Sequence, residues 1–177
     1  MIKRVSEILT EKAFLKKGAE MNRIKEISRE LERLNQYQND LYHEYASHIG
    51  LSDTVFWILY LVYGEEEMFT QNQIADLWHM PRQSINSAAA SLVKRGFLRL
   101  EKLPLARNNK GLCLTEAGKA FCERMIRPFY LLEERVIEAI PEEEREMYLK
   151  ISRKWNGLFA EEIQAAVKKL SGNMYKI

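Results

Sequence analysis

Hydrophobic residues recur every three or four positions along most of this chain, and this spacing predicts a mainly helical protein. The first apolar stripe lies within residues 20–49 and predicts one long helix that Gly50 ends. The stripe consists of Met21, Ile24, Ile27, Leu31, Leu34, Leu41 and Tyr45. Residues 1–18 are amphipathic and form either a further helix or a loose arm. A second helix is expected from Ser52 to Gly64, and its apolar character on most sides predicts a central place in the core.

Two short helices separated by a break are predicted next. Thr70 and Gln73 have the spacing of a capping box, in which the two side chains satisfy free amide groups and start a helix. The break falls around His79, and Pro81 fits the first turn of the second helix, where its missing N–H costs nothing. Four residues at helical spacing give this second helix a buried face: Ile85, Ala88, Ala89 and Leu92. Gly96 suits the left-handed position that commonly follows a helix.

A basic two-stranded hairpin is predicted after this helix. Residues 97–102 alternate between apolar and polar as a strand does, residues 104–109 form a turn-rich tip, and residues 111–114 return as a second strand. Residues 81–119 carry a net charge of +6, whereas the whole chain carries +2 and the remainder therefore −4. This concentration of positive charge is what binding to a nucleic-acid backbone requires.

Two more helical stretches complete the pattern. Thr115 begins the first, and Pro128 should kink it or mark a bend. Pro141 and the three glutamates after it predict the start of the last helix, because proline and acidic residues are favoured in a first turn. Residues 171–177 are expected to form a frayed tail. The apolar faces comprise Phe121, Met125, Phe129, Leu132 and Val136 in the first stretch, and Tyr148, Ile151, Trp155, Leu158, Phe159, Ile163 and Val167 in the second.

Composition excludes several classes of protein. The longest apolar run, residues 55–63, is too short to cross a membrane, and the charged N-terminus lacks the core of a signal peptide, so a cytoplasmic protein is expected. The chain contains no glycine-rich phosphate loop, no H-E-x-x-H and no G-x-S-x-G. An enzyme is therefore not expected, and neither a metal nor another cofactor is predicted.

The L-T-E-A-G of Leu114–Gly118 follows the basic hairpin and the Lys-Arg-Gly end of the preceding helix. In this setting the chain resembles the MarR family of winged helix-turn-helix transcriptional regulators. The resemblance implies a mainly α fold with a small antiparallel β wing, in which long N- and C-terminal dimerisation helices flank the winged helix-turn-helix. It divides a single domain, residues 1–177, into an N-terminal dimerisation region (1–49), the winged unit (50–119) and C-terminal dimerisation helices (120–177).

The resemblance implies that the second short helix enters the DNA major groove and that the hairpin serves as the wing. The DNA-binding residues expected on the helix are Arg82, Gln83, Ser84, Asn86, Ser87, Lys94 and Arg95, and those expected on the wing are Arg99, Arg107, Asn108 and Lys110. The family's wing usually carries an Asp-x-Arg, and this chain has Ala106 and Asn108 at those positions. Arg107 and Lys110 are the two candidates to replace the missing arginine.

The sequence contains three kinds of candidate sensor site. Tyr37, Tyr45, Trp57 and Trp78 are candidates for binding a small aromatic ligand, although aromatic residues at helical spacing also pack as ordinary core. A metal is the second alternative, because Asp40, His43, Glu44 and His48 lie close together in the sequence; the other interpretation is a polar helix end. Oxidation of Cys113 or Cys122 is the third, and both cysteines are better interpreted as small buried hydrophobes.

The combined prediction is a sequence-specific transcriptional regulator, a dimeric repressor that a small ligand releases from a pseudo-palindromic double-stranded operator. The apolar stripes of the terminal helices require a partner, which is either a second copy of the chain or the other stripe of the same chain. Two functional alternatives remain: a winged-helix module that binds proteins without binding DNA, and a regulator that senses a metal.

Overall fold

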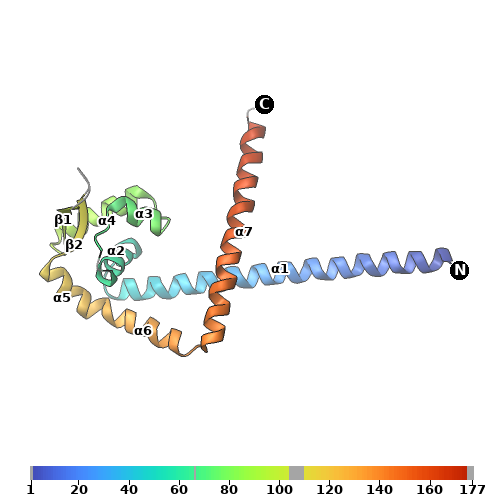
Figure 1. The fold of residues 1–177 in the computed structure, drawn as a ribbon, viewed down its shortest axis with the longest axis horizontal. Coiled ribbons are helices and arrows are strands. Elements are labelled where there is room, and N and C mark those ends of the chain that lie inside the picture. Colours follow the sequence, from blue (N-terminus) through green and yellow to red (C-terminus); the bar gives the residue numbers. More distant parts are fainter. Residues whose placement is uncertain (1, 66, 104–109, 175–177) are drawn as a thin grey trace. The chain divides into compact units, whose positions relative to one another are not determined.

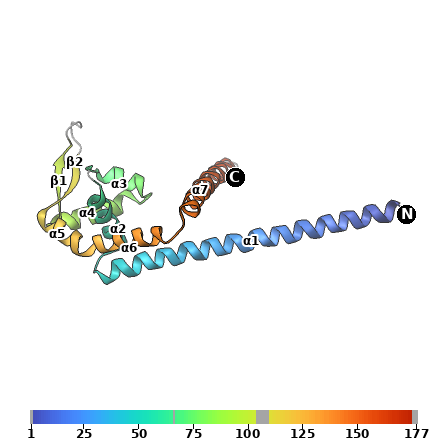
Figure 2. The ribbon, with the colours of Figure 1, turned by 60° about the horizontal axis from the view of Figure 1, so that its bottom comes forward.

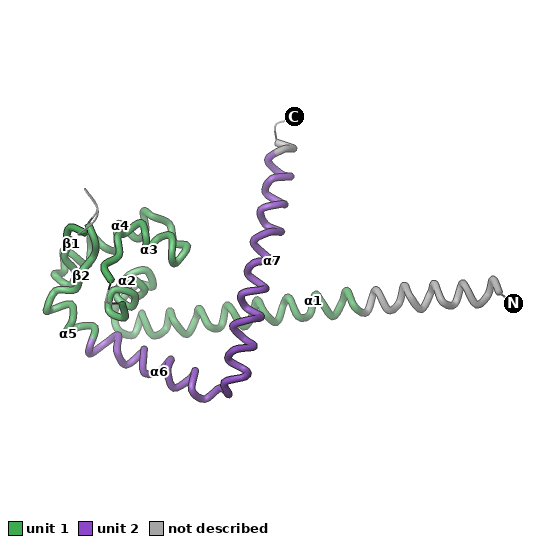
Figure 3. Tube along the Cα trace, viewed as in Figure 1, with its two compact units in different colours: residues 1–122 green, residues 123–177 purple. Residues whose placement is uncertain are grey.

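The computed structural model describes residues 2–65, 67–103 and 110–174, and the side chains of those between residues 20 and 171. It is mainly helical with one antiparallel pair of strands (Figure 1), which confirms the predicted fold class. The elements are α1 (Ile2–His48), α2 (Asp53–Gly64), α3 (Gln71–Leu77), α4 (Arg82–Lys94), β1 (Leu98–Lys102), β2 (Lys110–Leu114), α5 (Glu116–Met125), α6 (Arg127–Glu138) and α7 (Glu142–Met174). The chain forms two compact units, residues 1–122 and residues 123–177 (Figure 3).

The first helix is longer than its apolar stripe alone predicted. Residues 1–18 were expected to be either a helix or a loose arm, and α1 runs without interruption from Ile2 to His48. Gly50 ends it in the left-handed region, with φ of +73°. Its N–H donates to the carbonyl of Ser47 at 3.0 Å, and the N–H of Leu51 donates to the carbonyl of Ala46 at 2.9 Å. This pair of hydrogen bonds is the Schellman motif, which needs a residue with positive φ and therefore favours glycine.

The core of the first unit is built around α2. Its predicted central place is confirmed, because Phe56, Ile58 and Leu59 are completely shielded from solvent. The helix contacts α1, α4 and β2, and α4 in turn contacts α3 and β1, so that these elements form one cluster (Figure 2). Burying an aliphatic or aromatic side chain fully is worth about 1.5–3 kcal/mol, so this cluster fixes the positions of α3 and α4.

The helix predicted from Thr115 is divided in two at Ile126. α5 ends at Met125, and α6 begins at Arg127 with Pro128 as its second residue. A proline in a helix interior would lose a hydrogen bond and clash with the preceding turn, whereas the first turn tolerates it. The carbonyl of Ile126 accepts instead from the amides of Phe129 (3.0 Å) and Tyr130 (3.2 Å). The predicted bend at Pro128 thus corresponds to a one-residue interruption of the helix at Ile126.

The last helix begins close to its predicted start but ends later. Pro141 lies just before the first turn rather than in it, and its carbonyl accepts from Glu144 and Arg145, each at 3.0 Å. α7 continues to Met174, so the expectation of a frayed tail is wrong for residues 171–174. Extending an existing helix adds one hydrogen bond per residue without a new nucleation cost. This gain outweighs the low helix propensity of Ser171, Gly172 and Asn173. The rest of that predicted tail lies outside the described residues. No described helix is both long enough and apolar enough to span a membrane.

Candidate nucleic-acid interface

The helix-turn-helix begins at the predicted capping box. The backbone N–H of Gln73 donates to the Thr70 hydroxyl at 3.2 Å, and the backbone N–H of Thr70 donates to the Gln73 side chain at 2.8 Å. Each residue satisfies an amide that the first turn of α3 would otherwise leave free. The start of α3 is therefore fixed locally, as its sequence predicted.

A second Schellman motif forms the turn between α3 and α4. The N–H of Met80 donates to the carbonyl of Ala75 at 2.9 Å, and the N–H of His79 donates to the carbonyl of Asp76 at 3.4 Å. His79 occupies the position that glycine usually takes, with φ of +50°. A left-handed conformation costs a residue with a side chain about 1–2 kcal/mol. The two hydrogen bonds therefore hold the turn closed although the backbone conformation of His79 is unfavourable.

The second helix of the pair, α4, has one buried and one exposed face. The predicted buried face is confirmed, because Ile85, Ala88, Ala89 and Leu92 are all buried. α4 begins one residue later than predicted, so Pro81 lies just before the helix and not in its first turn. The ψ of Pro81 is extended at 128°, and its carbonyl accepts from the N–H of Ile85 at 3.2 Å. The exposed face carries the predicted polar residues Arg82, Gln83, Ser84, Asn86 and Ser87.

One residue of this exposed face has a partner from the neighbouring helix. Nη2 of Arg82 lies 3.3 Å from Oδ1 of Asp76 on α3. The two side chains are 64% and 68% exposed, so the pair stands in solvent. An exposed pair of this kind contributes only about 0–1 kcal/mol to folding. Its main effects are on the charge and the orientation of the Arg82 guanidinium.

The C-terminal end of α4 forms a third Schellman motif. Gly96, with φ of +74°, donates to the carbonyl of Val93 at 3.0 Å, and Phe97 donates to the carbonyl of Leu92 at 3.0 Å. This confirms the predicted role of Gly96. The Arg95 guanidinium lies over the Phe97 ring, 4.9 Å from its centre, so a cation–π contact holds this arginine at the helix end. Lys94, the last residue of α4, is exposed.

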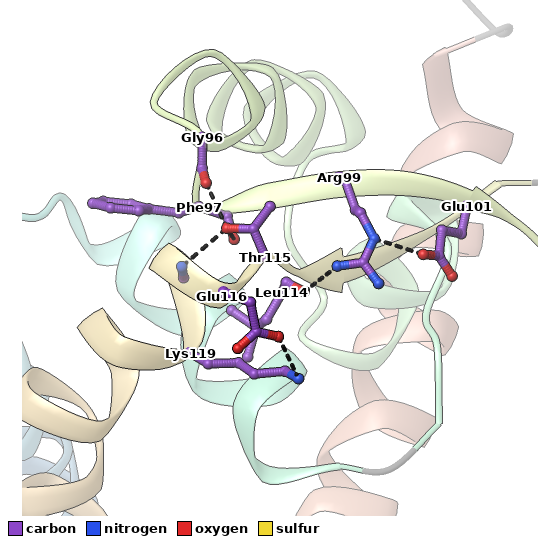
Figure 4. A network of polar contacts seen from close by, with 9 residues as sticks. Gly96, Phe97, Arg99, Glu101, Leu114, Thr115, Glu116 and Lys119 are labelled. Atoms are coloured by element: carbon purple, nitrogen blue, oxygen red, sulfur yellow. Dashed lines mark hydrogen bonds and ion pairs between the residues drawn. The ribbon is translucent and has the colours of Figure 1, made fainter.

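Thr115 joins this helix end to α5 (Figure 4). Its hydroxyl donates to the Gly96 carbonyl at 2.5 Å and accepts from the N–H of Gly118 at 3.0 Å, while its own N–H donates to the Phe97 carbonyl at 3.0 Å. A Cβ on Gly118 would overlap the Phe97 carbonyl oxygen, far inside van der Waals contact. The threonine and glycine of the L-T-E-A-G segment therefore share one structural role, which is to fasten α5 against the end of α4.

The wing is an antiparallel pair in which Leu98 faces Leu114 and Lys102 faces Lys110. Arg99 is engaged at the base of the wing: Nε donates to Glu101 and Nη1 donates to the Leu114 carbonyl, each at 2.6 Å (Figure 4). The hydrogen bond to Arg99 is the main reason that the pKa of Glu101 lies below its usual range and that the pKa of Arg99 is raised. The structure thus gives Arg99 a role in shaping the wing.

Two lysines face each other at the outer end of the strands. Lys102 and Lys110 are cross-strand partners, and both are exposed. Like charges directly opposite each other on a sheet destabilise it, and a bound anion would relieve the repulsion. Lys102 was not among the predicted DNA-binding residues, because the strand register that pairs it with Lys110 cannot be read from the sequence. Arg107 and Asn108 lie outside the described residues.

Cys113 shares a face of the wing with the Arg99–Glu101 pair. Burial and the nearby Glu101 carboxylate raise the pKa of the Cys113 thiol, which favours the protonated and less reactive form. Cys122 is fully buried. These environments fit the interpretation of both cysteines as hydrophobic side chains.

The aromatic residues form a cluster where α1, α2 and α3 meet. The rings of Trp57 and Trp78 are 4.7 Å apart, and Tyr42 lies against Trp57 at 4.9 Å. Tyr45 joins the cluster through Phe56, with the ring centres 6.0 Å apart. Burial raises the pKa of the Tyr45 hydroxyl. Of the four predicted ligand-binding residues, Tyr37 shows no contact with the cluster in the described part of the chain, and its side chain is 63% exposed.

His43, near the end of α1, forms hydrogen bonds with two neighbouring side chains. Nδ1 of His43 lies 2.9 Å from Oδ1 of Asp53, and its Nε2 lies 3.3 Å from the Ser47 hydroxyl. Both ring nitrogens of His43 are thereby engaged. Within residues 20–171, so far as they are described, no three histidine, cysteine or carboxylate side chains come together as metal ligands.

Comparison with known proteins agrees with this geometry. A sequence model described as the MarR family matches residues 49–107, which contain α2 to β1. Comparison with curated proteins gives no match. Among solved structures, a MarR family regulator from Neisseria meningitidis is 20% identical with a TM-score of 0.60, and the match covers 79% of this chain and 97% of that one.

Two further solved structures contain DNA. A putative MarR family regulator from Listeria monocytogenes, in complex with a 26mer DNA, is 18% identical with a TM-score of 0.60, covering 76% of this chain and 89% of that one. The MepR–DNA complex from Staphylococcus aureus is 17% identical with a TM-score of 0.57, covering 71% and 96%. At these identities the likeness establishes the fold.

The described part of the chain therefore has the winged helix-turn-helix fold of these solved structures. The family match covers residues 49–107, about a third of the chain, and agrees with the resemblance to the MarR family noted in the sequence.

Proposed function

We propose that the protein is a dimeric repressor that binds a pseudo-palindromic operator through α4 and the wing, in the cytoplasm. The observation that carries this proposal is the exposed polar face of α4, which is free of large apolar side chains and opens with an arginine. A slender helix of this kind fits the major groove, which is wide enough to admit one helix.

The side chains of α4 suit the chemistry of base edges. Arginine pairs with the two acceptors of guanine, and asparagine or glutamine pairs with adenine, so Arg82, Asn86 and Gln83 are the proposed base-reading residues. Ser84 and Ser87 are short enough to contact a base or a phosphate. Lys94 and Arg95 are proposed to contact phosphates from the other end of the helix.

The wing is proposed to meet the adjacent backbone through Lys110. Lys102, its cross-strand partner, adds a second cation at the same place. Arg107 remains a further candidate, with Asn108 beside it. Arg99 is proposed to support this surface from the base of the wing, since two of its nitrogens already bind Glu101 and Leu114.

Exposed apolar residues support the proposed dimer. In the first unit, an exposed stripe follows α1: Met21, Ile24, Ile27, Leu34, Tyr37 and Leu41, each between 45% and 63% exposed. In the second unit, α6 and α7 expose a larger set: Leu131, Leu132, Val136, Ile137, Met147, Tyr148, Ile151, Trp155, Leu158, Phe159, Ile163, Val167 and Leu170. Apolar surface of this extent marks an interaction site. A second copy is the proposed partner, because two-fold pairing can place two recognition helices about 34 Å apart, one turn of DNA.

Release by a small aromatic ligand is proposed to involve the aromatic cluster around Trp57 and Trp78. The Trp78 Nε1 is buried and has no hydrogen-bond partner among the described residues, so a polar ligand atom would find a donor there. Tyr45 is a second proposed contact. Tyr37, which is 63% exposed, is retained as a proposed ligand contact.

Selection of bound sequences from a random duplex pool tests the function directly. A dimeric operator-binding protein should enrich a palindrome whose half-sites are one helical turn apart, and its affinity should fall steeply with salt. A winged module that binds only proteins would enrich no sequence and would show no salt-dependent binding to duplex DNA. Light scattering on the same sample should give the mass of two chains.

A further inference from the structure

We infer that Asp76 is a specificity-determining residue of the recognition surface, acting through the orientation and charge of Arg82. This inference rests on the proposed role of α4 in DNA binding. It begins from a contact between two helices: Oδ1 of Asp76, in the last turn of α3, lies 3.3 Å from Nη2 of Arg82, the first residue of α4.

The location of the pair decides what it can do. Arg82 is the arginine of the exposed α4 face, so any group within 3.3 Å of its guanidinium meets whatever that face binds. Both side chains are mainly exposed, and such a pair adds little to folding stability. A carboxylate here also reduces the net positive charge beside residues 81–119, which carry +6. Stability and general attraction to DNA therefore do not account for Asp76.

The carboxylate affects the two kinds of DNA contact in opposite ways. A phosphate that approaches Arg82 meets the negative charge of Asp76 and has to compete with it for the guanidinium. A guanine base accepts from two donors of an arginine and carries no net charge, and an arginine held on one edge still has donors left for it. Asp76 thus weakens the contact of Arg82 with a phosphate, which is independent of sequence. It also orients Arg82 for a contact with a base, which depends on sequence.

The test compares Asp76→Asn with the wild-type full-length protein on two probes. One probe is the duplex that the wild-type protein selects from a random pool, and the other is a scrambled duplex of equal length and composition. In Asp76→Asn, binding to the scrambled duplex should strengthen by about threefold to tenfold, and its salt slope should steepen by about 1 per bound protomer as Arg82 gains a phosphate. The ratio of the two affinities should fall at least about fivefold, part of the discrimination that a bidentate arginine provides.

Three further variants separate this role from a structural or a general charge effect. Asp76→Glu keeps the carboxylate and should keep most of the affinity ratio. Arg82→Ala should remove the effect, so that adding Asp76→Asn to it changes the ratio by less than about twofold. Glu116→Gln removes the same charge from a carboxylate that pairs with Lys119 at 3.1 Å, and it should leave the ratio unchanged.

Urea unfolding midpoints of all variants should stay close to the wild-type value, because the pair is exposed. An unchanged affinity ratio in Asp76→Asn, or an equal fall in the Arg82→Ala background, would overturn the inference while leaving the DNA-binding function in place. Failure of the wild-type protein to enrich any duplex would overturn both.

Discussion

The backbone carbonyl of Phe97 and the α-carbon of Gly118 pack so closely that a Cβ on Gly118 would overlap the carbonyl oxygen. The contact joins Phe97, which follows Gly96 just beyond the end of α4, to the first turn of α5. Because the obstructing atom belongs to the backbone, no side-chain rotation can relieve it. Glycine is therefore required at position 118 because the Phe97 carbonyl leaves no room for a Cβ, and not because of a left-handed backbone conformation.

Gly118→Ala should therefore destabilise the protein by about 3 kcal/mol, at the upper end of the usual cost of overpacking. Urea unfolding followed by circular dichroism measures this loss. Gly157→Ala is the matched control, since Gly157 lies within α7 and a Cβ there would meet nothing within 4 Å. The control should stabilise the protein by about 0.5–1 kcal/mol, because alanine favours a helix interior more than glycine does. Equal effects of the two substitutions would contradict the close approach.

Thr115→Val should cost about 1–3 kcal/mol. The substitution keeps the shape of the side chain but removes the hydroxyl that donates to Gly96 and accepts from Gly118, leaving both backbone groups without that partner. Thr115→Ser retains the hydroxyl and should recover most of the loss. Denaturant midpoints of the two variants test this, and a serine variant as unstable as the valine variant would count against the hydrogen bonds.

His79→Gly should stabilise the protein by about 0.5–1 kcal/mol. Glycine removes the cost of the left-handed conformation at φ of +50°, and the gain is partly offset by the greater entropy of glycine in the unfolded chain. Gly50→Ala, at φ of +73° with open space around its Cβ, is the inverse control and should destabilise the chain. Thermal unfolding of both variants measures the signs, which should be opposite.

Lys102→Ala and Lys110→Ala should each raise the thermal midpoint of the free protein slightly, because the two like charges face each other across the wing. Each should also reduce the salt slope of duplex binding by about 1 per bound protomer if the lysine contacts a phosphate. Lys119→Ala is the control for the thermal midpoint. Lys119 pairs with Glu116, so removing it breaks a favourable contact and should not raise the midpoint. A salt slope unchanged in both wing variants would remove the wing from the proposed interface.

The thiol of Cys113 should react slowly with alkylating agents at neutral pH. Burial and the Glu101 carboxylate raise its pKa above the ordinary value of 9.0, so the reactive thiolate forms only at higher pH than in an unfolded chain. The associated stability is fully present below pH 9.0 and is lost as the pH rises through the folded pKa. Rates of alkylation measured against pH, in buffer and in urea, test the direction. Glu101→Gln should move the native profile toward lower pH, and a native profile that lies below the unfolded one would refute the account.

Elements whose cause is local were predictable from the sequence. The capping box at Thr70 depends on one residue three positions away, and the helix end at Gly96 depends on a single glycine, so both were found where expected. The buried face of α4 follows from helical periodicity alone. The boundaries at Pro81 and Pro141 were each wrong by one residue, because proline is tolerated equally well just before a helix and in its first turn.

Contacts between distant elements could not be predicted in the same way. Asp76 and Arg82 are on different helices, and their contact depends on the angle of the turn at His79. The pairing of Lys102 with Lys110 depends on the strand register, which a hairpin tip of unspecified geometry does not determine. The engagement of Arg99 with Leu114 likewise depends on that register. The proposed interface was thus identified as a segment, while its ion pairs required three-dimensional coordinates.

The junction at Thr115 also has a mechanical consequence. The end of α4 and the first turn of α5 share two carbonyls, one hydroxyl and a contact too tight to slide, so the two helices can only be displaced together. In the proposed complex, a displacement of α5 would therefore move α4, and docking of α4 in a groove would restrain α5 in return. Duplex binding by α4, as proposed, and the position of the first turn of α5 would then be coupled directly through Thr115 and Gly118.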